Sequence, residues 1–481
     1  MIVRLSDGSD LPIEMYKARV VQKTTLPPID QRLRAIEEAG YNTFLLWTKD
    51  IFIDMLTDSG TNAMSDNQLA AMMISDDAYA GGESYLRLGA AVQEVLGLEY
   101  YLPCHQGRAA EHLLAKIFCR PGTVTPMNYH FTTTKAHFEM AGSSVLEIYH
   151  DDAMETASEN PFKGNLDMEK FQGVIDEYGS SNIAFVRMEA TTNLIGGQPF
   201  SMENLRQVYE LAQQHRIPVI LDCSLVSENA YFIKCREPSY ADVSIADIVR
   251  EMMSLSDLIY LSGRKSACVR GGLLATNNLE YFNQLKAWLP VYEGFITYGG
   301  MSSKEIEAMA VGLREMVDLD VASSSADLIQ DFVQKMVARG IPAVTPPGGL
   351  AGHVDAMKFL PHVPQEQYTA GALAAALYLV SGVRSMERGT ISMDRDAEGN
   401  DVPSDLELCR MAVPRRVYTR SHTDYVVDRL AWLQDHANLV GGLEFFEEPP
   451  VLRFFTGRLR ALDGWGQRLA EAFRQDFGDQ L

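Results

Sequence analysis

Cysteine is scarce and scattered in this sequence. The six cysteines lie at positions 104, 119, 223, 235, 268 and 409, and no two of them have Cys-x-x-Cys spacing. A disulfide framework or a structural zinc site usually shows closely spaced, paired cysteines. The sequence therefore argues against both and fits a reducing compartment, so we expect a cytoplasmic protein.

Long apolar runs are also missing. A helix that spans a bilayer needs about 20 consecutive apolar residues, and even the longest apolar stretches, such as 371–380, fall well short of that length. The opening residues, MIVRLSDGSDLPIEMYK, contain no continuous apolar core of the signal-peptide kind. We therefore expect a soluble protein with no membrane partner.

An excess of positive charge is absent too. The sequence has 42 Lys and Arg against 64 Asp and Glu, which gives a formal net charge of −22. A surface of this sign repels nucleic acid and anionic lipid, so we expect neither as a partner. Anionic small molecules remain compatible, because groups inside a pocket outweigh the mean field. The hydrophobic content of 46% is that of a globular protein and excludes disorder.

The order of apolar segments predicts an α/β fold. From about residue 95, short apolar runs alternate with helical patterns, which indicates βαβ units and a mostly parallel sheet. The expected strands are 100–103, 183–188, 218–221 and 258–261, and the expected helices are 109–118 and 202–215.

A different pattern begins after about residue 310 and indicates a separate, smaller α+β domain. Its expected helices are 322–339, 370–380 and a terminal helix within 460–481, and its extended pieces lie around 384–393 and 407–414. Single cores stop growing near about 250–300 residues, so a chain of 481 residues needs more than one. We expect an N-terminal segment (1–56) that packs with the small domain, a large domain (57–310) and the small domain (311–481).

Polar residues follow the expected strands, where ligands bind in open α/β sheets. The turn Gln106-Gly107-Arg108 opens a helix and offers an anion free backbone N–H groups and a positive charge. The alternative is a capped turn with a surface arginine. Asp222 ends a buried strand, where a carboxylate needs a cationic or hydrogen-bonding partner unless it caps a helix.

Lys265 and Asn193 complete this set. The amine of Lys265 can form an imine with an aldehyde, although most lysines are solvated surface residues. Asn193 by itself is a turn asparagine. The order of phosphate turn, aromatic residue, asparagine, aspartate and lysine is typical of fold type I enzymes that use pyridoxal 5′-phosphate (PLP). In these enzymes an aspartate pairs with the protonated pyridine nitrogen.

Six ordered segments resemble the β-eliminating lyases, the family of tyrosine phenol-lyase and tryptophanase. They are LTDSGTNAMSD (56–66), HQGRAAE (105–111), HFTTTKAH (130–137), NLIGGQPFSMENL (193–205), ENAYFIK (228–234) and EGFITYGG (293–300). The resemblance implies PLP fold type I (aspartate aminotransferase-like), with a large domain built on a mostly parallel seven-stranded sheet and a smaller α+β domain. It also implies a homo-oligomer, a tetramer whose active sites are shared within dimers.

The resemblance implies roles at the cofactor. Lys265 matches the lysine that carries PLP as a Schiff base, and Asp222 matches the partner of the pyridine nitrogen. Phe131 matches the ring that stacks on the pyridine, and Asn193 matches a contact to the cofactor and to the substrate carboxylate. The residues implied at the phosphate are Gln106, Gly107, Arg108 and Ser262.

The resemblance also implies substrate contacts and is nearest to the tyrosine phenol-lyase branch. Arg410 matches the arginine at the α-carboxylate, with Thr57 and Ser59 flanking it. Arg388 and Thr132 match the pair at the phenolic oxygen. The remaining substrate contacts implied are Asn193, Met386, Phe454 and Phe455, and phenylalanine stands at 454–455 where tryptophanases carry a histidine.

Tyr79 matches the acid that protonates the leaving group, and its alternative is a half-buried packing tyrosine. The family also binds an activating monovalent cation, K+ for example. Gly60 and Asp77 are the candidates for that site, with Asp77 in place of a longer glutamate.

Three positions near the cofactor depart from the family. Leu225 replaces an arginine beside the cofactor's phenolate oxygen, and loss of that charge should alter its protonation balance. Arg264 replaces a lysine and Ser266 replaces an aspartate. These departures cluster at the cofactor rather than at the surface.

Three functions are compatible with these residues. The leading one is β-elimination of L-tyrosine to phenol, pyruvate and ammonium. The second is a divergent β- or γ-eliminase or a synthase acting on another amino acid, which Leu225 and Arg264 favour. The third is a PLP-binding scaffold without turnover. The joint retention of four residues argues against it: Lys265, Asp222, Tyr79 and Arg410.

Overall fold

The computed structural model describes residues 2–396 and 398–479. The chain divides into two compact units. Unit 1 holds residues 59–153 and 160–326, and unit 2 holds residues 2–58, 154–159 and those from 327 onward. The domain limits expected from the sequence, at 56/57 and 310/311, stay a prediction. Within the described residues, every helix is too short or too polar to cross a membrane.

Unit 1 is built on a seven-stranded sheet with the order β4-β10-β9-β8-β7-β5-β6. β10 runs antiparallel to both its neighbours, whereas β9-β8, β8-β7, β7-β5 and β5-β6 pair in parallel. The mostly parallel seven-stranded sheet is therefore confirmed. The strands are β4 (Tyr100–Cys104), β5 (Val124–Met127), β6 (Ser144–Glu147), β7 (Val186–Glu189), β8 (Val219–Asp222), β9 (Leu258–Ser262) and β10 (Gly272–Thr276).

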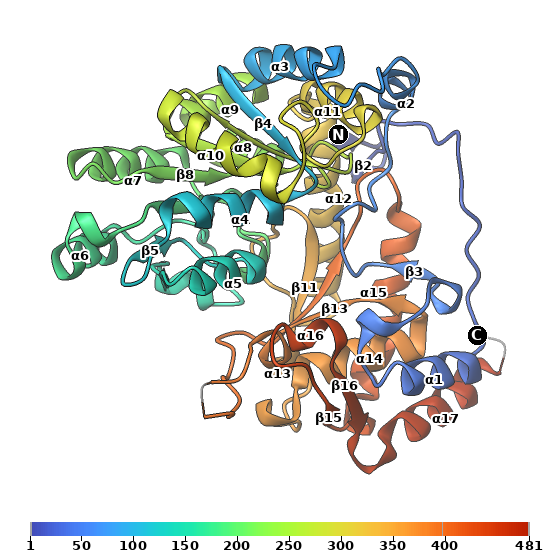
Figure 1. Ribbon diagram of the computed structural model, residues 1–481. Coiled ribbons are helices and arrows are strands. Elements are labelled where there is room, and N and C mark those ends of the chain that lie inside the picture. The colour runs from blue at the N-terminus through green and yellow to red at the C-terminus, as the bar shows by residue number, and fades with distance from the viewer. Residues whose placement is uncertain (1, 397, 480–481) are drawn as a thin grey trace. The chain divides into compact units, whose positions relative to one another are not determined.

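The sheet of unit 1 separates two hydrophobic cores. Successive side chains of a strand point to opposite faces, so Ile220 packs into one core while Val219 and Leu221 pack into the other. Strands covered on both faces are apolar throughout, which explains the short Val-Ile-Leu run before Asp222. Figure 1 shows these strands and helices in the upper half of the view.

The helices of unit 1 form where apolar residues recur at helical spacing behind a capping residue. In α7 the Ser201 side chain accepts a hydrogen bond from the Asn204 N–H, and Leu205 and Val208 are buried on one side. The expected helices 109–118 and 202–215 are confirmed. The helices are α2 (Asp66–Met73), α3 (Glu83–Leu96), α4 (Gly107–Phe118), α5 (Thr132–Met140), α6 (Met168–Tyr178), α7 (Met202–Gln214), α8 (Val226–Arg236), α9 (Ile245–Ser254), α10 (Leu279–Tyr292) and α11 (Ser303–Glu315).

Unit 2 contains an antiparallel sheet of three strands in the order β11-β14-β13. Its central helix, α14, is buried on every side, as expected for a helix that is apolar all round. The helices α1, α15 and α17 pack against α14, and the expected terminal helix is found as α17, with 480–481 outside the described residues.

The remaining elements of unit 2 include three short two-stranded pairings, β1-β2, β3-β12 and β15-β16. The helix α12 begins before residue 327 and continues into unit 2. The strands are β1 (Ile2–Arg4), β2 (Asp10–Pro12), β3 (Ile53–Asp54), β11 (Ala351–Asp355), β12 (Val383–Arg384), β13 (Met386–Arg388), β14 (Leu408–Ala412), β15 (Leu443–Glu447) and β16 (Arg458–Ala461). The helices are α1 (Ile29–Glu38), α12 (Leu319–Ala338), α13 (Ala356–Phe359), α14 (Thr369–Ser381), α15 (Arg420–Asp435), α16 (Arg453–Thr456) and α17 (Trp465–Phe477).

Candidate active site

Asp222 lies at the carboxyl end of β8 inside a buried network of charged side chains. Nη2 of Arg187, on β7, donates to Oδ2 of Asp222 at 2.7 Å and to Oε2 of Glu189 at 3.1 Å. Nε of Arg187 donates to the Tyr260 hydroxyl, on β9, at 2.8 Å. The strand alternation puts all four side chains on the face that α4 covers.

Carboxyl groups outnumber guanidinium groups in this network. Glu111 of α4 approaches it and accepts hydrogen bonds from two threonine hydroxyls. Burial raises the pKa of Glu189 and of Glu111, and the negative charge of Asp222 raises both further. The charge of Arg187 opposes the rise, but three acids share it. A protonated ring nitrogen beside Asp222 would supply the missing positive charge, so the network fits the pyridine of PLP.

Lys265 lies in the turn after β9 and faces the same network. Its Nζ is 5.1 Å from the centroid of the Phe131 ring, and its charge opposes the rise in the pKa of Glu189. The turn is held by its backbone, since Nδ2 of Asn62 donates to the Lys265 carbonyl at 3.1 Å. The lysine is half-buried rather than in open solvent. An amine beside an aromatic ring and a carboxylate network fits a bound aromatic aldehyde.

The turn before α4 approaches the sheet closely because of two glycines. A Cβ on Gly107 would lie 3.0 Å from Cβ of Ser262, and a Cβ on Gly272 would lie 2.6 Å from the carbonyl carbon of Gln106. Side chains at 107 or 272 would push the turn away from β9 and β10. The first N–H groups of a helix such as α4 have no partner within the helix, so this turn fits an anion.

Positive charge gathers beside the same turn. Nη1 of Arg264 donates to Oε1 of Gln106 at 3.0 Å. Burial lowers the pKa of the Arg264 guanidinium, and the charges of Arg270 and Arg108 lower it further. Three arginines that repel one another make a site that an anion neutralises. The arrangement fits the phosphate of PLP. Arg264 replaces the lysine of the family, so a cation is kept at this position.

Asn193 and Leu225 are buried near the charged network of Arg187, Glu189 and Asp222. Asn193 is buried, and its backbone N–H donates to Oε1 of Glu189 at 3.1 Å. Leu225 is buried just before α8, and its carbonyl accepts a hydrogen bond from the Thr191 hydroxyl. The side chain at position 225 therefore contributes apolar surface where the family has a charge.

Tyr79 lies exposed in the segment between α2 and α3. Its side chain is 73% exposed, and its ring lies 6.0 Å from Phe295 and 5.3 Å from Tyr298, centroid to centroid. A hydrogen bond to Tyr298, followed by the charge of that tyrosine, raises the pKa of Tyr79. The half-buried packing alternative for Tyr79 does not match an exposed ring.

Thr132, the first residue of α5, directly follows Phe131.

Gly60 lies against Arg264. The Gly60 N–H donates to the Arg264 carbonyl at 3.0 Å, and a Cβ on Gly60 would lie 2.8 Å from the guanidinium. Asp77 is exposed. Among the described residues, no group of three or more His, Cys, Asp or Glu side chains could hold a metal ion.

The expected substrate arginines lie side by side in unit 2. Arg410, on β14, pairs in register with Met386 of β13, and Nη2 of Arg410 donates to the Leu56 carbonyl at 2.9 Å. Burial and then the neighbouring charge of Arg388 lower the pKa of Arg410 to about 10, while Asp58 opposes the fall. Two buried guanidinium groups so close together fit an anionic ligand such as a carboxylate.

An aromatic cluster in unit 2 lies beside β13, since Phe44 and Phe454 line one cavity with Glu387 of that strand. The rings of Phe454 and Phe455 lie 3.9 Å apart, and both pack edge-on against Phe44. Thr57 and Ser59 lie on either side of the boundary between the units, flanking the buried Asp58.

Sequence reasoning missed Arg187 and Glu189. Both lie in the short strand Val186–Glu189, which is otherwise apolar and fully buried. A charge in such a strand is costly unless it is paired. Arg187 and Glu189 within the apolar strand 186–189 therefore indicate a buried ion pair. The same signal was available for Glu387 and Glu407 in unit 2, both of which are buried.

The fold defines the class of the protein. Serine palmitoyltransferase from Sphingomonas wittichii superposes with a TM-score of 0.57 at 12% identity, covering 81% of this chain and 88% of that chain. A serine palmitoyltransferase solved with PLP superposes with a TM-score of 0.54 over 80% of this chain and 88% of that one. The fold is therefore fold type I of the PLP-dependent enzymes, as the sequence predicted.

Residues 54–429 match the model of the β-eliminating lyases. The chain belongs to the β-eliminating lyase family and is a PLP-dependent lyase. Tyrosine phenol-lyase from Pasteurella multocida is 45% identical over 450 residues, 93% of this chain and 98% of that protein. Tyrosine phenol-lyase from Symbiobacterium thermophilum is 44% identical over 451 residues, with the same shares covered. The family resemblance seen in the sequence is confirmed.

Proposed function

We propose that this enzyme catalyses β-elimination of L-tyrosine or a close relative, converting L-tyrosine and water to phenol, pyruvate and ammonium. The observation that carries the proposal is the 44–45% identity to tyrosine phenol-lyases along 93% of the chain. The buried guanidinium groups of Arg388 and Arg410 support it, because the substrate carries a carboxylate and a phenolic oxygen.

The unit 1 residues hold the cofactor and move the first proton. Lys265 would hold the aldehyde of PLP through its amine, Asp222 would face the ring nitrogen, and the Gln106–Arg108 turn with Ser262 would bind the phosphate. When bound, PLP supplies an electron sink for the electron pair left at Cα. The Lys265 amine would then be the base that takes the proton from Cα.

The remaining residues orient the substrate and the leaving group. Arg410 binds the α-carboxylate, with Thr57, Ser59 and Asn193 beside it, and thereby fixes the direction of the Cα–H bond. Arg388 and Thr132 hold the phenolic oxygen, while Met386, Phe454 and Phe455 enclose the ring. Tyr79 donates a proton to the ring carbon as the Cβ bond breaks.

The test is to incubate the purified enzyme with L-tyrosine and to measure phenol and pyruvate separately. Equal amounts of both products support the proposal. Lys265→Ala should abolish both and also remove the visible absorption band of the bound cofactor. Pyruvate from serine or cysteine derivatives without phenol from tyrosine would contradict the proposal.

A second function is favoured by Leu225. The buried apolar side chain removes a positive charge beside the cofactor, which fits a divergent β- or γ-eliminase or a synthase acting on another amino acid. Leu225→Arg distinguishes the two. A gain in phenol release from tyrosine would show that the wild-type residue has moved the enzyme away from that substrate.

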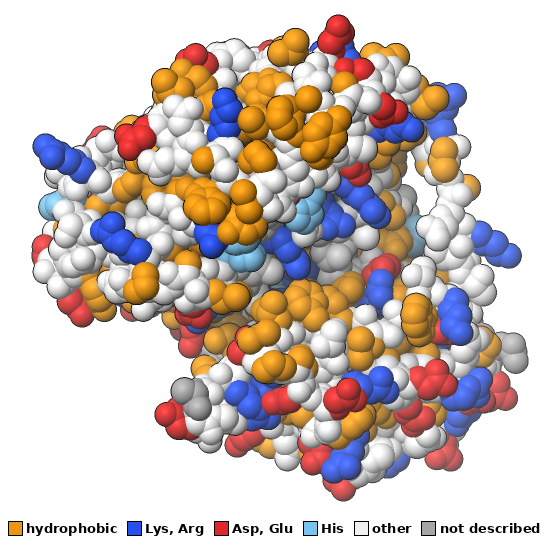
Figure 2. All heavy atoms as spheres, viewed as in Figure 1, with side chains coloured by type: hydrophobic (Ala, Val, Ile, Leu, Met, Phe, Trp, Pro, Cys, Tyr) orange, Lys and Arg blue, Asp and Glu red, His pale blue; other side chains and the backbone are white. Residues whose placement is uncertain are grey.

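The enzyme works as a homotetramer with active sites shared within dimers. Support comes from the exposed apolar side chains of unit 1, which include Met73 and Ile74 near Tyr79. Figure 2 shows hydrophobic side chains gathered over the elements of unit 1. Light scattering gives the mass. Mixing Lys265→Ala with Tyr79→Phe should restore part of the activity if the two residues come from different chains.

A monovalent cation such as K+ at Gly60 and Asp77 also belongs to this proposal, although the guanidinium of Arg264 already lies against Gly60. Replacing K+ by tetramethylammonium at constant ionic strength tests it. Equal activity in the two salts would remove the cation from the proposal.

A further inference from the structure

Two acidic side chains are buried beside the strand that carries Arg388. Glu387 is 8% exposed and precedes Arg388 in β13, and Glu407 is 3% exposed and precedes β14. A Cβ on Gly389 would lie 2.3 Å from Oε2 of Glu407, so the chain after Arg388 runs directly against this carboxyl group. We call Glu387 and Glu407 the carboxyl pair.

Glu387 is connected to Arg388 through one hydroxyl group. Oγ of Ser392 donates to Oε2 of Glu387 at 2.7 Å, and Nη1 of Arg388 donates to the same Oγ at 3.2 Å. The guanidinium has no acceptor to offer, so the serine proton points at Glu387: at Oε2, or at its backbone carbonyl, which lies farther away at 3.4 Å. An ionised Glu387 therefore fixes the serine in the orientation that receives Arg388.

Glu407 holds the other side of the same turn. Its Oε1 accepts hydrogen bonds from the Thr390 N–H at 2.7 Å and from Oγ1 of Thr390 at 2.6 Å. Its Oε2 accepts a hydrogen bond from the Ala370 N–H of α14 at 3.1 Å. The turn 389–392 is thus fixed to the body of unit 2 by Glu407 and to the Arg388 guanidinium by Glu387.

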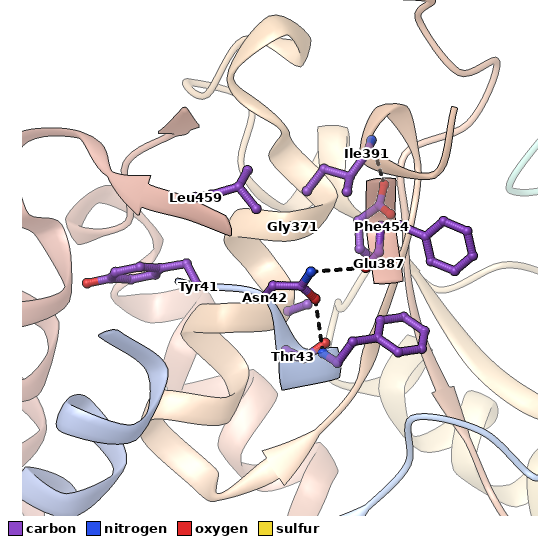
Figure 3. Close-up of a pocket in the computed structure, with 10 residues that line it drawn as sticks. Tyr41, Asn42, Thr43, Gly371, Glu387, Ile391, Phe454 and Leu459 are labelled. Carbon is purple, nitrogen blue, oxygen red and sulfur yellow. Dashed lines mark hydrogen bonds between the residues drawn. The ribbon is translucent and has the colours of Figure 1, made fainter. Parts of the chain in front are cut away.

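The surroundings of Glu387 offer it little water. Figure 3 shows its side chain at a cavity together with Asn42, Ile391 and Phe454, and the Ile391 N–H donates to Oε1 of Glu387 at 3.2 Å. The cavity has room for about one water molecule. A carboxylate placed here depends on protein groups for its stabilisation.

We propose that Glu387 is a positioning residue for the leaving-group end of the substrate: through Ser392 it holds the Arg388 guanidinium in place, and it does so in its ionised form. The proposal rests on the proposed function, in which Arg388 contacts the phenolic oxygen. It deepens that function by giving this contact a dependence on pH.

The charged and titratable groups that face Glu387 set the direction of that dependence. They are Arg388 on the same strand, Cys409 on β14 and Glu407 just before β14. Arg453 of α16 adds a further charge and donates to the Thr390 carbonyl at 2.8 Å. Burial and then the charge of Glu407 raise the pKa of Glu387 to about 7, against the hydrogen bond from Ser392 and the charge of Arg388. The contact between Arg388 and the phenolic oxygen should therefore become stronger as pH rises through about 7.

Binding of two non-reacting acids to the PLP-loaded enzyme tests this. The probes are 3-(4-hydroxyphenyl)propanoate and 3-phenylpropanoate, which differ by one hydroxyl group, and calorimetry at pH 6 and pH 8.5 gives their affinity ratio. In the wild type the hydroxyl should improve affinity about tenfold more at pH 8.5 than at pH 6. Glu387→Gln and Ser392→Ala should both lose this pH dependence, since each breaks the link to Arg388.

Thr390→Val is the matched control, because it alters the same turn on the Glu407 side and leaves the Glu387–Ser392–Arg388 link intact. It should keep the pH-dependent ratio. A ratio that is independent of pH in the wild type, or unchanged in both Glu387→Gln and Ser392→Ala, overturns the inference. Turnover of tyrosine is measured separately: a wild type that releases no phenol but shows the pH-dependent ratio contradicts the proposed function and leaves the role of Glu387 supported.

Discussion

At the scale of single residues, this enzyme depends on charges that are buried and shared. Arg187 is fully buried between Asp222 and Glu189, and it holds Asp222 in place before any cofactor is present. The pair is a preorganised acceptor for a cationic ring nitrogen, since the carboxylate needs no rearrangement to meet it.

Removing Arg187 should be strongly destabilising. Arg187→Met leaves two buried acids without their cation, which should lower the free energy of unfolding by about 3–5 kcal/mol. Urea denaturation measures the loss. Arg206→Met is the control, because the Arg206 side chain is 38% exposed and its ion-pair partners, Glu251 and the more distant Glu203, are partly exposed as well, so its loss should stay within about 1 kcal/mol. Equal losses in the two variants would contradict the buried network.

Glu387 gives a prediction for stability against pH. Its pKa in the folded state is raised from 4.5 to about 7, so the folded protein binds a proton that the unfolded chain releases earlier. The resulting stability is complete below about pH 4.5 and is lost as pH rises through about 7. Glu387→Gln should therefore have a melting temperature near that of the wild type at pH 5 and above it at pH 8.5. Parallel curves for the two proteins would refute the raised pKa.

At the scale of elements, short contacts tie helices to the Lys265 turn. Gln68 of α2 is fully buried, and its Nε2 donates to the Ala267 carbonyl at 2.8 Å and to the Ala308 carbonyl of α11 at 3.1 Å. Its Oε1 accepts the Ser65 N–H, which completes a capping box at the start of α2. One side chain thus connects two helices and the turn after β9.

Gln68→Met should loosen this connection. It removes a buried donor from the Ala267 carbonyl and the second donor from the Ala308 carbonyl, which should cost about 1–3 kcal/mol of stability. Hydrogen exchange should become faster in α2 and in the turn 263–271. Gln93→Met, on the exposed side of α3, is the matched control and should change stability by less than about 0.5 kcal/mol. Unchanged exchange in both segments would show that Gln68 is not the link.

At the scale of the whole molecule, the net charge of −22 sets how the enzyme responds to salt. Like charges spread over the surface repel one another and oppose the folded state. Screening shortens their range to about 8 Å at 0.15 M ionic strength.

Added salt should therefore raise the melting temperature. We expect an increase between about 10 mM and 150 mM NaCl, measured by differential scanning fluorimetry. A larger increase in KCl than in NaCl at equal ionic strength would point to a bound K+ rather than to screening. A fall in melting temperature with NaCl would contradict the argument from net charge.

Much of the fold could be read from periodicity. The alternation of short apolar runs with helices located β4, β8 and β9 to within a residue or so, because strands covered on both faces must be apolar. β10 was not predicted: it follows β9 closely in the chain, but it lies antiparallel between β9 and β4, and its pairing with the distant β4 leaves no local signal.

The chemical groups of the enzyme can be identified from the amino-acid order alone: a lysine, an aspartate, an anion-binding turn and a set of arginines, in an order that few folds share. Which side chains lie next to these groups becomes known only from the folded structure. Arg187 became the partner of Asp222, Arg264 joined Gln106, and Glu387 reached Arg388 through Ser392. Charge pairing depends on the distance between the groups in space and on their burial. Residues far apart in the sequence come close together and become buried only when the chain folds.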